Sequence, residues 1–196
     1  ERRCCLCLTA CSRFGRCVTG LFGWITGKSE CLANPSKYAT RTSRFDKNRT
    51  GEKEGTMEHK LVSFVITSYN NYKYIYEAVE SVLTQDYPRI QLIFSNDGSP
   101  DFDADALQSY VDEHKGRNIV DVQIYAHKTN RGTVQNVEFC RQKAEGDFLM
   151  YMAADDALDA PNVLSRYVSE FERLGPDVLV VCSKVAMCGE SLDDIE

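Results

Sequence analysis

The sequence predicts an α/β domain with a mostly parallel sheet and helices on both of its faces. Two observations support this prediction. Short apolar runs alternate along the chain with segments whose apolar residues recur at helical spacing, which is the order of repeated strand–helix–strand units. Polar, turn-forming residues directly follow three of the apolar runs. Because 196 residues, 43% of them hydrophobic, can bury one medium core, we expect a single main domain.

The first predicted elements are a strand, a helix and a second strand. Residues 61–67 ("LVSFVIT") are apolar and rich in β-branched side chains, as in a strand buried on both faces. The following helix has Asn70 or Asn71 available as its N-cap. Its apolar face is made of Ile75, Val79, Val82 and Leu83. Residues 90–95 ("IQLIFS") predict the second strand.

A turn-rich stretch then leads into a second helix and a third strand. Ser99 is the predicted cap of this helix, and Pro100 would take its first position. The apolar face of the helix is made of Ala104, Leu107, Tyr110 and Val111. Residues 119–126 alternate between apolar and polar side chains, which is typical of a strand.

Two helices and two strands complete the prediction. The first helix spans 133–144 and should direct three side chains inward: Val134, Val137 and Cys140. Residues 147–156 contain a continuous apolar strand. The second helix starts at about Pro161 and has an apolar face made of Leu164, Tyr167, Val168 and Phe171. Residues 177–183 predict a last strand.

The charge of the chain is divided unevenly. Residues 1–59 carry eleven Lys or Arg and six acidic residues, whereas residues 60–196 carry twelve and twenty-three. The acidic part has no stripe of basic residues with interleaved aromatics, so we do not expect nucleic acid as a partner.

Cysteine usage follows the same division. Cys140 and Cys182 fall inside predicted elements, where a thiol behaves as a small apolar group, and this favours a reducing cytoplasm. Six other cysteines lie near the start of the chain without a CxxC pair or a nearby His, which is a weak signal for a zinc or iron–sulfur site. These six are Cys4, Cys5, Cys7, Cys11, Cys17 and Cys31.

We predict that residues 1–56 are a basic, Cys-rich extension, nonnative or misassigned, and that the domain occupies 57–196. From about Asn34 to Thr56 the extension is polar and almost free of aliphatic residues, so disorder is expected there. No run reaches the roughly 18 apolar residues of a membrane helix. We therefore expect a cytoplasmic protein, with peripheral association at the inner face of the membrane left open.

Three polar clusters stand at predicted carboxyl ends of strands. They are "TSYN" (67–70), "NDGS" (96–99) and "AADD" (153–156). In open parallel sheets, ligands bind in the crevice beyond these ends. The three clusters should therefore meet at one edge of the sheet and form the ligand site.

Asp155 and Asp156 are the candidate metal ligands. Adjacent carboxylates repel each other unless solvent or a cation screens them. Mg²⁺ and Mn²⁺ bind carboxylate oxygens and usually keep waters and phosphate oxygens as further ligands. A metal held here could bridge a diphosphate and neutralise the charge it gains on leaving. The alternative is that "DDALDAP" only caps the following helix, because Asp is favoured near helix N-termini.

Asp97 is the candidate for recognition of a base. Its carboxylate could accept the imide N–H of uracil or thymine, with Thr67 and Tyr69 lining the base pocket. The alternatives are a simple Asp-Gly turn and a tyrosine that only covers a helix end. Arg131 could face phosphate or be an ordinary exposed loop arginine. The chain has no GxGxxG after the first strand and no GxxxxGK[ST], which argues against a dinucleotide site and a P-loop.

Three segments together carry a family resemblance. They are "VSFVITSYNNYKYIYEAVESVLTQDYPRIQLIFSNDGSPD", "NRGTVQN" and "AEGDFLMYMAADDALDAP". In order and spacing they resemble the donor-binding half of family 2 glycosyltransferases, which have the Rossmann-like GT-A fold. The resemblance spans about residues 60–185.

The resemblance implies an inverting glycosyltransferase that uses a nucleotide-diphosphate sugar, usually linked to UDP or dTDP, and Mn²⁺ or Mg²⁺. The acceptor would be a saccharide or a lipid-linked hydroxyl, in a setting such as bacterial polysaccharide assembly. By position, the donor nucleotide would contact Thr67, Tyr69, Asn71, Asp97, Arg131 and Asp155, and the metal would contact Asp155 and Asp156.

The sequence departs from the family pattern at Asn96 and Ala153, where the family often has Asp. The general base of the family lies well beyond the metal motif, so we expect it beyond Glu196, on an acceptor-binding half that residues 57–196 lack. Such a fragment would bind donor and metal but transfer sugar poorly.

Two rival functions remain open at this point. A nucleotidyltransferase that builds sugar nucleotides would need a Gly-rich, basic loop after the first strand, and "SYNNYKY" is not one. A non-catalytic nucleotide- and metal-binding module would use the same acidic edge without transferring sugar.

Overall fold

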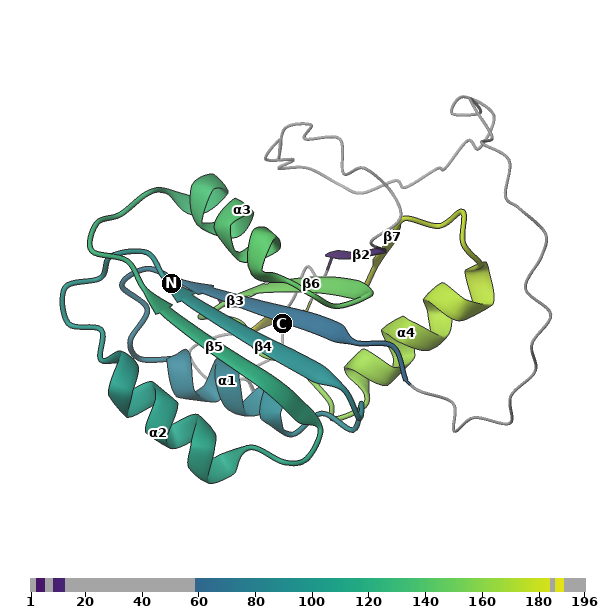
Figure 1. Ribbon diagram of the computed structural model, residues 1–196, viewed down its shortest axis with the longest axis horizontal. Coiled ribbons are helices and arrows are strands. Elements are labelled where there is room, and N and C mark those ends of the chain that lie inside the picture. Colours follow the sequence, from purple (N-terminus) through teal and green to yellow (C-terminus); the bar gives the residue numbers. More distant parts are fainter. Residues whose placement is uncertain (1–2, 6–8, 13–58, 184–185, 189–196) are drawn as a thin grey trace. The chain divides into compact units, whose positions relative to one another are not determined.

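The computed structural model describes residues 3–5, 9–12, 59–183 and 186–188. Its main feature is a six-stranded sheet with the strand order β5-β4-β3-β6-β2-β7 (Figure 1). The strands are β2 (Thr9–Ser12), β3 (Val62–Ser68), β4 (Ile90–Asn96), β5 (Ile119–Ala126), β6 (Phe148–Ala153) and β7 (Val180–Cys182). Strands β5, β4, β3 and β6 are parallel, which confirms the predicted mostly parallel α/β sheet.

Helices cover both faces of this sheet. They are α1 (Ile75–Leu83), α2 (Ala104–His114), α3 (Thr133–Lys143) and α4 (Val163–Leu174). Helices α1, α2 and α4 contribute to the larger apolar core, and α3 packs on the opposite face of the sheet (Figure 1). The central strands are thus buried on both sides, which explains why they read as continuous apolar runs in the sequence.

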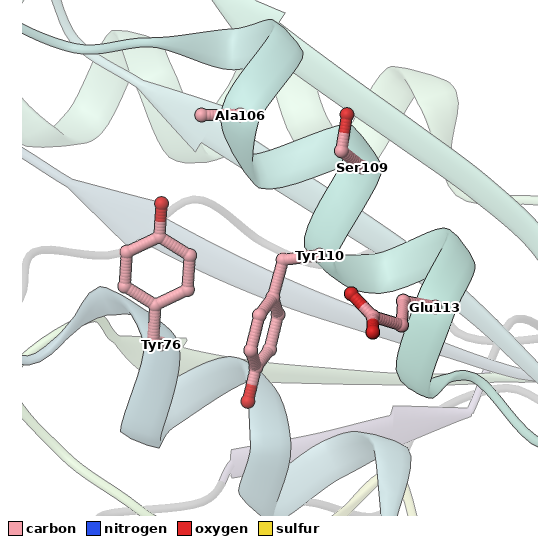
Figure 2. Close-up of a pocket in the computed structure, with 5 residues that line it drawn as sticks. All are labelled: Tyr76, Ala106, Ser109, Tyr110 and Glu113. Atoms are coloured by element: carbon pink, nitrogen blue, oxygen red, sulfur yellow. The ribbon is translucent and has the colours of Figure 1, made fainter.

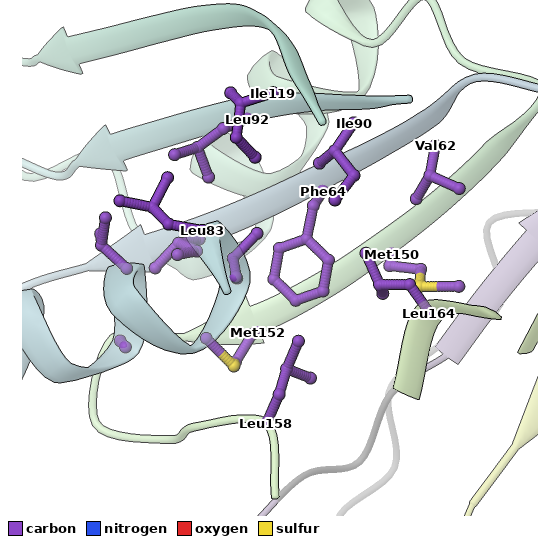
Figure 3. Packing of buried hydrophobic residues seen from close by; sticks show 14 of the residues in the cluster. Val62, Phe64, Leu83, Ile90, Leu92, Ile119, Met150, Met152, Leu158 and Leu164 are labelled. Carbon is purple, nitrogen blue, oxygen red and sulfur yellow. The ribbon is translucent and has the colours of Figure 1, made fainter. Parts of the chain in front are cut away.

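Alternate side chains of β3 divide between the two faces. Val62 and Phe64 lie in the larger core with residues of α1 and α4 (Figure 3). Val65 points to the other face and packs with Ile93 and Cys140 under α3. This alternation follows from the strand period of two, and it decides which rim residues lie on which face.

Part of the predicted extension pairs with the domain. Strand β2 lies between β6 and β7 and is antiparallel to both. A separate two-stranded sheet joins β1 (Arg3–Cys5) to β8 (Ala186–Cys188). Residues 34–56, for which we predict disorder, and the side chains of the early cysteines lie outside the described part of the structure.

The predicted caps of the first two helices are wrong. Helix α1 follows Tyr74, which makes no side-chain cap, while the backbone N–H of Asn70 donates to Ser99 Oγ and the Asn71 carbonyl accepts from Tyr74. Helix α2 begins at Ala104, and its N-cap is Asp103 in place of Ser99. The Asp103 carboxylate accepts the Ala106 N–H. Both predicted caps are used instead in contacts between loops.

Three further details differ from the prediction. Val134 is 77% exposed, so it does not point inward, although Cys140 is buried as expected. Helix α4 begins at Val163, because Pro161 belongs to the preceding loop and its carbonyl accepts the Asp86 N–H. The last strand of the main sheet is only three residues long, since β7 ends with Cys182.

Candidate functional site

The carboxyl ends of the four parallel strands form one edge of the sheet, called the rim here. It consists of the ends of β3, β4, β5 and β6 at Ser68, Asn96, Ala126 and Ala153. Thr67 is in register with Ser95 on one side and Ala153 on the other. The three polar clusters therefore leave the sheet side by side, as the sequence predicts.

Backbone hydrogen bonds extend the pairing of the strands into these loops. The Ala154 N–H donates to the Thr67 carbonyl at 2.9 Å, and the Asp97 N–H donates to the Ser68 carbonyl at 2.8 Å. The His127 N–H donates to the Asn96 carbonyl at 3.0 Å. The first residues beyond the strands are thus held nearly as firmly as the strands themselves.

Asp97 is 4% exposed and binds the loop that precedes α3. Its Oδ1 accepts the backbone N–H of Arg131 at 2.9 Å, and its Oδ2 accepts that of Gly132 at 2.8 Å. Gly98 has a φ of +79°, and a Cβ there would lie 2.4 Å from the Thr129 carbonyl carbon. The Asp-Gly pair is therefore a turn, but it also anchors the loop of residues 127–132 against the end of β4.

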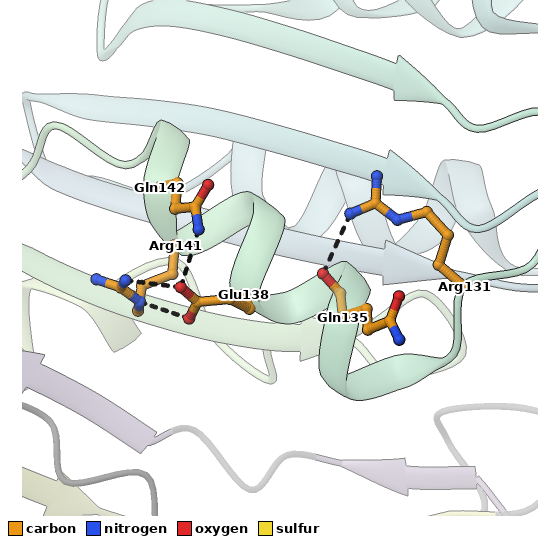
Figure 4. A network of polar contacts seen from close by, with 5 residues as sticks. All are labelled: Arg131, Gln135, Glu138, Arg141 and Gln142. Atoms are coloured by element: carbon orange, nitrogen blue, oxygen red, sulfur yellow. Dashed lines mark hydrogen bonds and ion pairs between the residues drawn. The ribbon is translucent and has the colours of Figure 1, made fainter.

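Among the described residues, Arg131 is hydrogen-bonded to Asp97 only through the Arg131 backbone N–H. The Arg131 guanidinium lies on α3 (Figure 4). The guanidinium carbon is 4.9 Å from the centre of the Phe139 ring. Its Nη2 donates to the Gln135 carbonyl at 3.4 Å, and Nη1 is 3.3 Å from His127 Nδ1. Arg131 is half-buried, so it is not an ordinary exposed loop arginine.

Three further residues predicted to contact the nucleoside lie within residues 67–71. Thr67 and Asn71 are half-buried, and Tyr69 is 46% exposed. Ser68, the residue after Thr67, is buried, and its Oγ has no hydrogen-bond partner among the described residues. Thr67 thus offers a hydroxyl on the face of the sheet opposite to Ser68, and Tyr69 offers an exposed ring directly after the end of β3.

Asp155 and Asp156 are both half-buried and directly follow the end of β6. The Asp156 N–H donates to the Ala153 carbonyl at 3.1 Å, in a tight turn. Helix α4 begins only at Val163, with Asn162 at its N-cap and no side-chain capping bond. The alternative in which these two carboxylates cap the following helix is therefore wrong.

The sequence interpretation missed a polar cluster beneath the rim. The Ser95 hydroxyl donates to Asn136 Oδ1 at 2.6 Å and lies 3.2 Å from His127 Nε2. Asn136 Nδ2 also donates to the Ser95 carbonyl at 3.2 Å. Ser95 and Asn136 are both buried. The available signals were a serine ending an otherwise apolar strand and an Asn on the inner face of a helix.

Two hollows lie on the surface, one between helices and one that begins at the rim loop. One lies between α1 and α2, where the rings of Tyr76 and Tyr110 meet edge to face at 4.8 Å (Figure 2). The other is on α3 and includes Arg131 and Glu138, the latter paired with Arg141 (Figure 4). Neither hollow contains Asp97, Asp155 or Asp156.

Two properties of the described residues bear on metal binding and on membranes. Within 59–183 and the short flanking strands, no group of three or more His, Cys, Asp or Glu side chains lies close enough to hold a metal ion by itself. In that same part of the chain, no helix has the length and apolar character needed to span a bilayer.

Comparisons with known proteins relate the chain to one family and one fold. An uncharacterized glycosyltransferase of Rickettsia typhi is 31% identical over 123 residues, which are 62% of this chain and 36% of that protein. The mannosyltransferase PcManGT from Pyrobaculum calidifontis, in complex with GDP-Man and Mn²⁺, has a TM-score of 0.51 at 20% identity over 57% of this chain and 32% of its own.

Staphylococcus aureus TarS 1-349 in complex with UDP gives a TM-score of 0.50 at 22% identity, over 58% of this chain and 32% of its own. The chain thus spans about a third of the length of these proteins. The similar structures have the GT-A fold, as expected. The model of glycosyl transferase family 2 matches residues 63–193. The chain therefore belongs to glycosyltransferase family 2.

Proposed function

We propose that this chain is the donor-binding part of a metal-assisted, inverting glycosyltransferase that uses a UDP-linked sugar. The acceptor would be a hydroxyl of a saccharide or a lipid-linked saccharide, at the cytoplasmic face of a membrane. TarS with UDP and PcManGT with GDP-Man and Mn²⁺ are similar in fold, and both bind nucleoside diphosphate groups. They support a donor of this chemical class.

The observation that carries the proposal is the position of the candidate residues along one rim. Asp97 follows β4, Thr67 is the second-last residue of the neighbouring β3, and Asp155 follows β6 on the other side of β3. A donor lying across these three strand ends would meet Asp97 at one end and the two adjacent carboxylates at the other. That is the order of base, ribose and diphosphate in a nucleotide sugar.

Asp97 has the chemistry to select a base even though it already binds the loop. Its two oxygens accept one backbone N–H each. An ionised carboxylate offers about four acceptor positions, so it can take a further N–H from a uracil ring. The two loop bonds fix the orientation of this acceptor before the donor arrives. Thr67, Tyr69 and Asn71 are the proposed neighbours of the nucleoside.

Asp155 and Asp156 fit a Mg²⁺ or Mn²⁺ ion that the protein holds only in part. Both side chains are half-buried at the end of β6, and no third carboxylate, His or Cys of the described residues completes a protein cage around them. Such ions commonly take one or two carboxylates and fill their other positions with waters and phosphate oxygens. When bound, the ion would supply neutralisation of the charge on the departing diphosphate. The two carboxylates would orient the ion and the ribose of the donor toward the rim.

Isothermal titration of the 196-residue chain with UDP-GlcNAc and Mn²⁺ tests this function. We expect saturable binding that EDTA weakens and that excess Mn²⁺ restores. The double variant Asp155→Asn/Asp156→Asn should lose at least about tenfold in affinity, because it removes both proposed metal ligands. Asp159→Asn changes an exposed carboxylate of the same loop and should bind like the wild type.

Two outcomes would contradict the proposal. One is the absence of binding by a folded wild-type chain with either UDP-GlcNAc or UDP. The other is equal affinity of the wild type and the double variant, which would point to a nucleotide-binding module that needs no metal at these carboxylates.

A further inference from the structure

His127 connects the end of β5, the end of β4 and α3 through its backbone and both ring nitrogens. Its N–H donates to the Asn96 carbonyl at 3.0 Å. Its ring meets the Phe139 ring of α3 edge to face, with 4.8 Å between the ring centres. Nε2 lies 3.2 Å from Ser95 Oγ, and Nδ1 lies 3.3 Å from Arg131 Nη1. No sequence motif singles out this residue, and its side chain is not among the proposed contacts of the donor.

The partners of the ring permit one arrangement of protons. Asn136 donates from Nδ2 to the Ser95 carbonyl, so its Oδ1 can only accept, and the Ser95 hydroxyl must donate to it. Ser95 Oγ then accepts from His127, which places a proton on Nε2. On the other side of the ring a guanidinium can only donate, so Nδ1 must be an unprotonated acceptor for Arg131. The network therefore assigns the neutral Nε2–H tautomer.

A second proton on the ring would break this arrangement. It would sit on Nδ1, where an N–H would face the N–H of a guanidinium and two positive charges would be in contact. The charged groups that face His127 are the Arg131 guanidinium and the Asp97 carboxylate. Burial and then the Arg131 charge lower the pKa of His127 below 6.5, while the Asp97 charge and a hydrogen bond with the Asn136 side chain act in the opposite direction.

The contact with His127 matters for the rim because Arg131 is held at two points. Its side chain is held by His127, Phe139 and the Gln135 carbonyl. Its backbone N–H and that of Gly132 bind the two oxygens of Asp97. A change in the position of the side chain is thus transmitted over a single residue to the carboxylate proposed to read the base.

We propose that neutral His127 is a positioning residue for the donor site. It holds the Arg131 side chain on α3 and thereby keeps the Arg131–Gly132 peptide on Asp97, and its protonation loosens this loop and weakens donor binding. This inference rests on the proposed function for the identity of the ligand, but the coupling between His127 and the loop is a property of the protein alone.

The first test measures the affinity for UDP-GlcNAc with Mn²⁺ between pH 8 and pH 5.5. This donor is a diphosphate diester without a group that titrates in this range. We expect the affinity of the wild type to fall as the pH drops below 6.5, by less than about tenfold at pH 5.5, because a ring with a lowered pKa is only partly protonated there. His127→Gln can donate to Ser95 and accept from Arg131 without titrating, so it should bind within about threefold of the wild type at pH 8 and lose most of the pH dependence.

Two more variants complete the first test. His127→Ala removes both ring contacts, so it should bind about tenfold more weakly at pH 8 and show little further change with pH. His114→Gln alters an exposed histidine of α2 and should keep the pH profile of the wild type. A pH profile of His127→Gln equal to that of the wild type would overturn the inference, and so would unchanged affinity of His127→Ala at pH 8.

The second test needs no ligand. The chain has three histidines, so NMR can assign the ring of His127 by its absence in His127→Gln. We expect nitrogen shifts of the neutral Nε2–H tautomer at pH 7.5 and amide resonances of Arg131 and Gly132 that follow the titration of His127. If these amides titrate but no donor binds, the coupling stands and the proposed function fails. If the donor binds but the amides do not follow His127, the function stands and the inference fails.

Discussion

Two serines of β3 are buried to nearly the same degree but differ in how their hydroxyls are satisfied. Ser63 is fully buried, and its hydroxyl donates to Gln91 Oε1 at 2.5 Å and accepts the Gly146 N–H at 2.8 Å. Ser68 is 3% exposed, and its Oγ has no hydrogen-bond partner within the described ranges. Burial of a hydroxyl is favourable only when its hydrogen bonds are made.

We therefore predict opposite results for alanine at the two positions. Ser63→Ala removes the acceptor of the Gly146 N–H and one of the two donors to Gln91 Oε1, and it should lower the free energy of unfolding by about 1–3 kcal/mol. Ser68→Ala removes an unsatisfied polar atom and should leave stability within about 0.5 kcal/mol of the wild type or raise it. Urea denaturation of both variants measures this difference. A loss at Ser68 as large as that at Ser63 would mean that the Ser68 hydroxyl has a partner, such as a buried water.

At the scale of the elements, the two glycines that shape the rim loops differ in the space around them. Gly98 and Gly132 both have positive φ, +79° and +85°, so an alanine is strained at either position. At Gly98 the added Cβ would meet backbone atoms of Thr129 and Asn130 at 2.4 and 2.5 Å, whereas at Gly132 nothing lies within 4 Å. Only the first substitution pushes the two loops apart.

Gly132→Ala should therefore cost only the backbone strain, about 1–2 kcal/mol. Gly98→Ala should cost that strain and roughly 1–3 kcal/mol more, because it displaces the loop that Asp97 binds. Chemical denaturation measures both values, and hydrogen exchange of the Arg131 and Gly132 amides should speed up only in the Gly98 variant. Equal effects of the two variants would contradict the close packing of the loops.

Among the elements, the bounds of β3, β4 and β5 could be predicted from the sequence, but the helix caps could not. Strand β5 has its predicted bounds, because its apolar and polar side chains alternate. Strands β3 and β4 differ from their predicted bounds by one residue, because a strand buried on both faces leaves a continuous apolar run. The caps could not be predicted from local pattern, since Ser99 has the right side chain for a cap but uses it to hold two neighbouring segments of the rim. Tertiary hydrogen bonds override local preference at such positions.

The candidate site divides in a similar way. That Asp97 and Asp155 follow strands and lie at one edge of the sheet follows from the order of elements and the rule for parallel sheets. That their strands lie on either side of β3 is known only from the strand pairing. The bonds from Asp97 to the loop before α3 and the ring contacts of His127 depend on a left-handed glycine and on strand register. Neither is encoded in a short motif, so these contacts required the structure.

At the scale of the whole molecule, Tyr87 joins distant parts of the fold. It is 4% exposed, and its hydroxyl donates to the Lys60 carbonyl at 2.6 Å, which ties the segment before β3 to the segment before β4. Burial, and then the negative charges of Glu172 and Asp147, raise the pKa of Tyr87 to about 12, while Arg89 lowers it. Its ionisation is therefore governed by residues from α4 and from the turn before β6.

This raised pKa predicts a loss of stability at alkaline pH. The unfolded chain releases the tyrosine proton near pH 10, while the folded chain keeps it to about pH 12. The stabilisation is therefore complete below pH 10 and is lost as the pH rises from about 10 to 12. For Tyr87 we expect this loss to be about 1–2 kcal/mol in the free energy of unfolding.

Tyr87→Phe removes the ionisation of Tyr87 and so isolates its contribution to the loss of stability at alkaline pH. The variant should lose roughly 1 kcal/mol at pH 7.5 with the hydrogen bond to Lys60, yet fall less steeply than the wild type between pH 9.5 and 11.5. The part that remains should come from Cys140 and Tyr110, because burial raises the pKa of the Cys140 thiol to about 11, and burial and the hydrogen bond to Glu80 raise the pKa of Tyr110 to about 12. Tyr87→Phe/Tyr110→Phe should then be the flattest of the three in urea denaturation across this range. If the single variant falls as steeply as the wild type, the buried phenol of Tyr87 does not hold its proton more tightly in the folded chain than in the unfolded one.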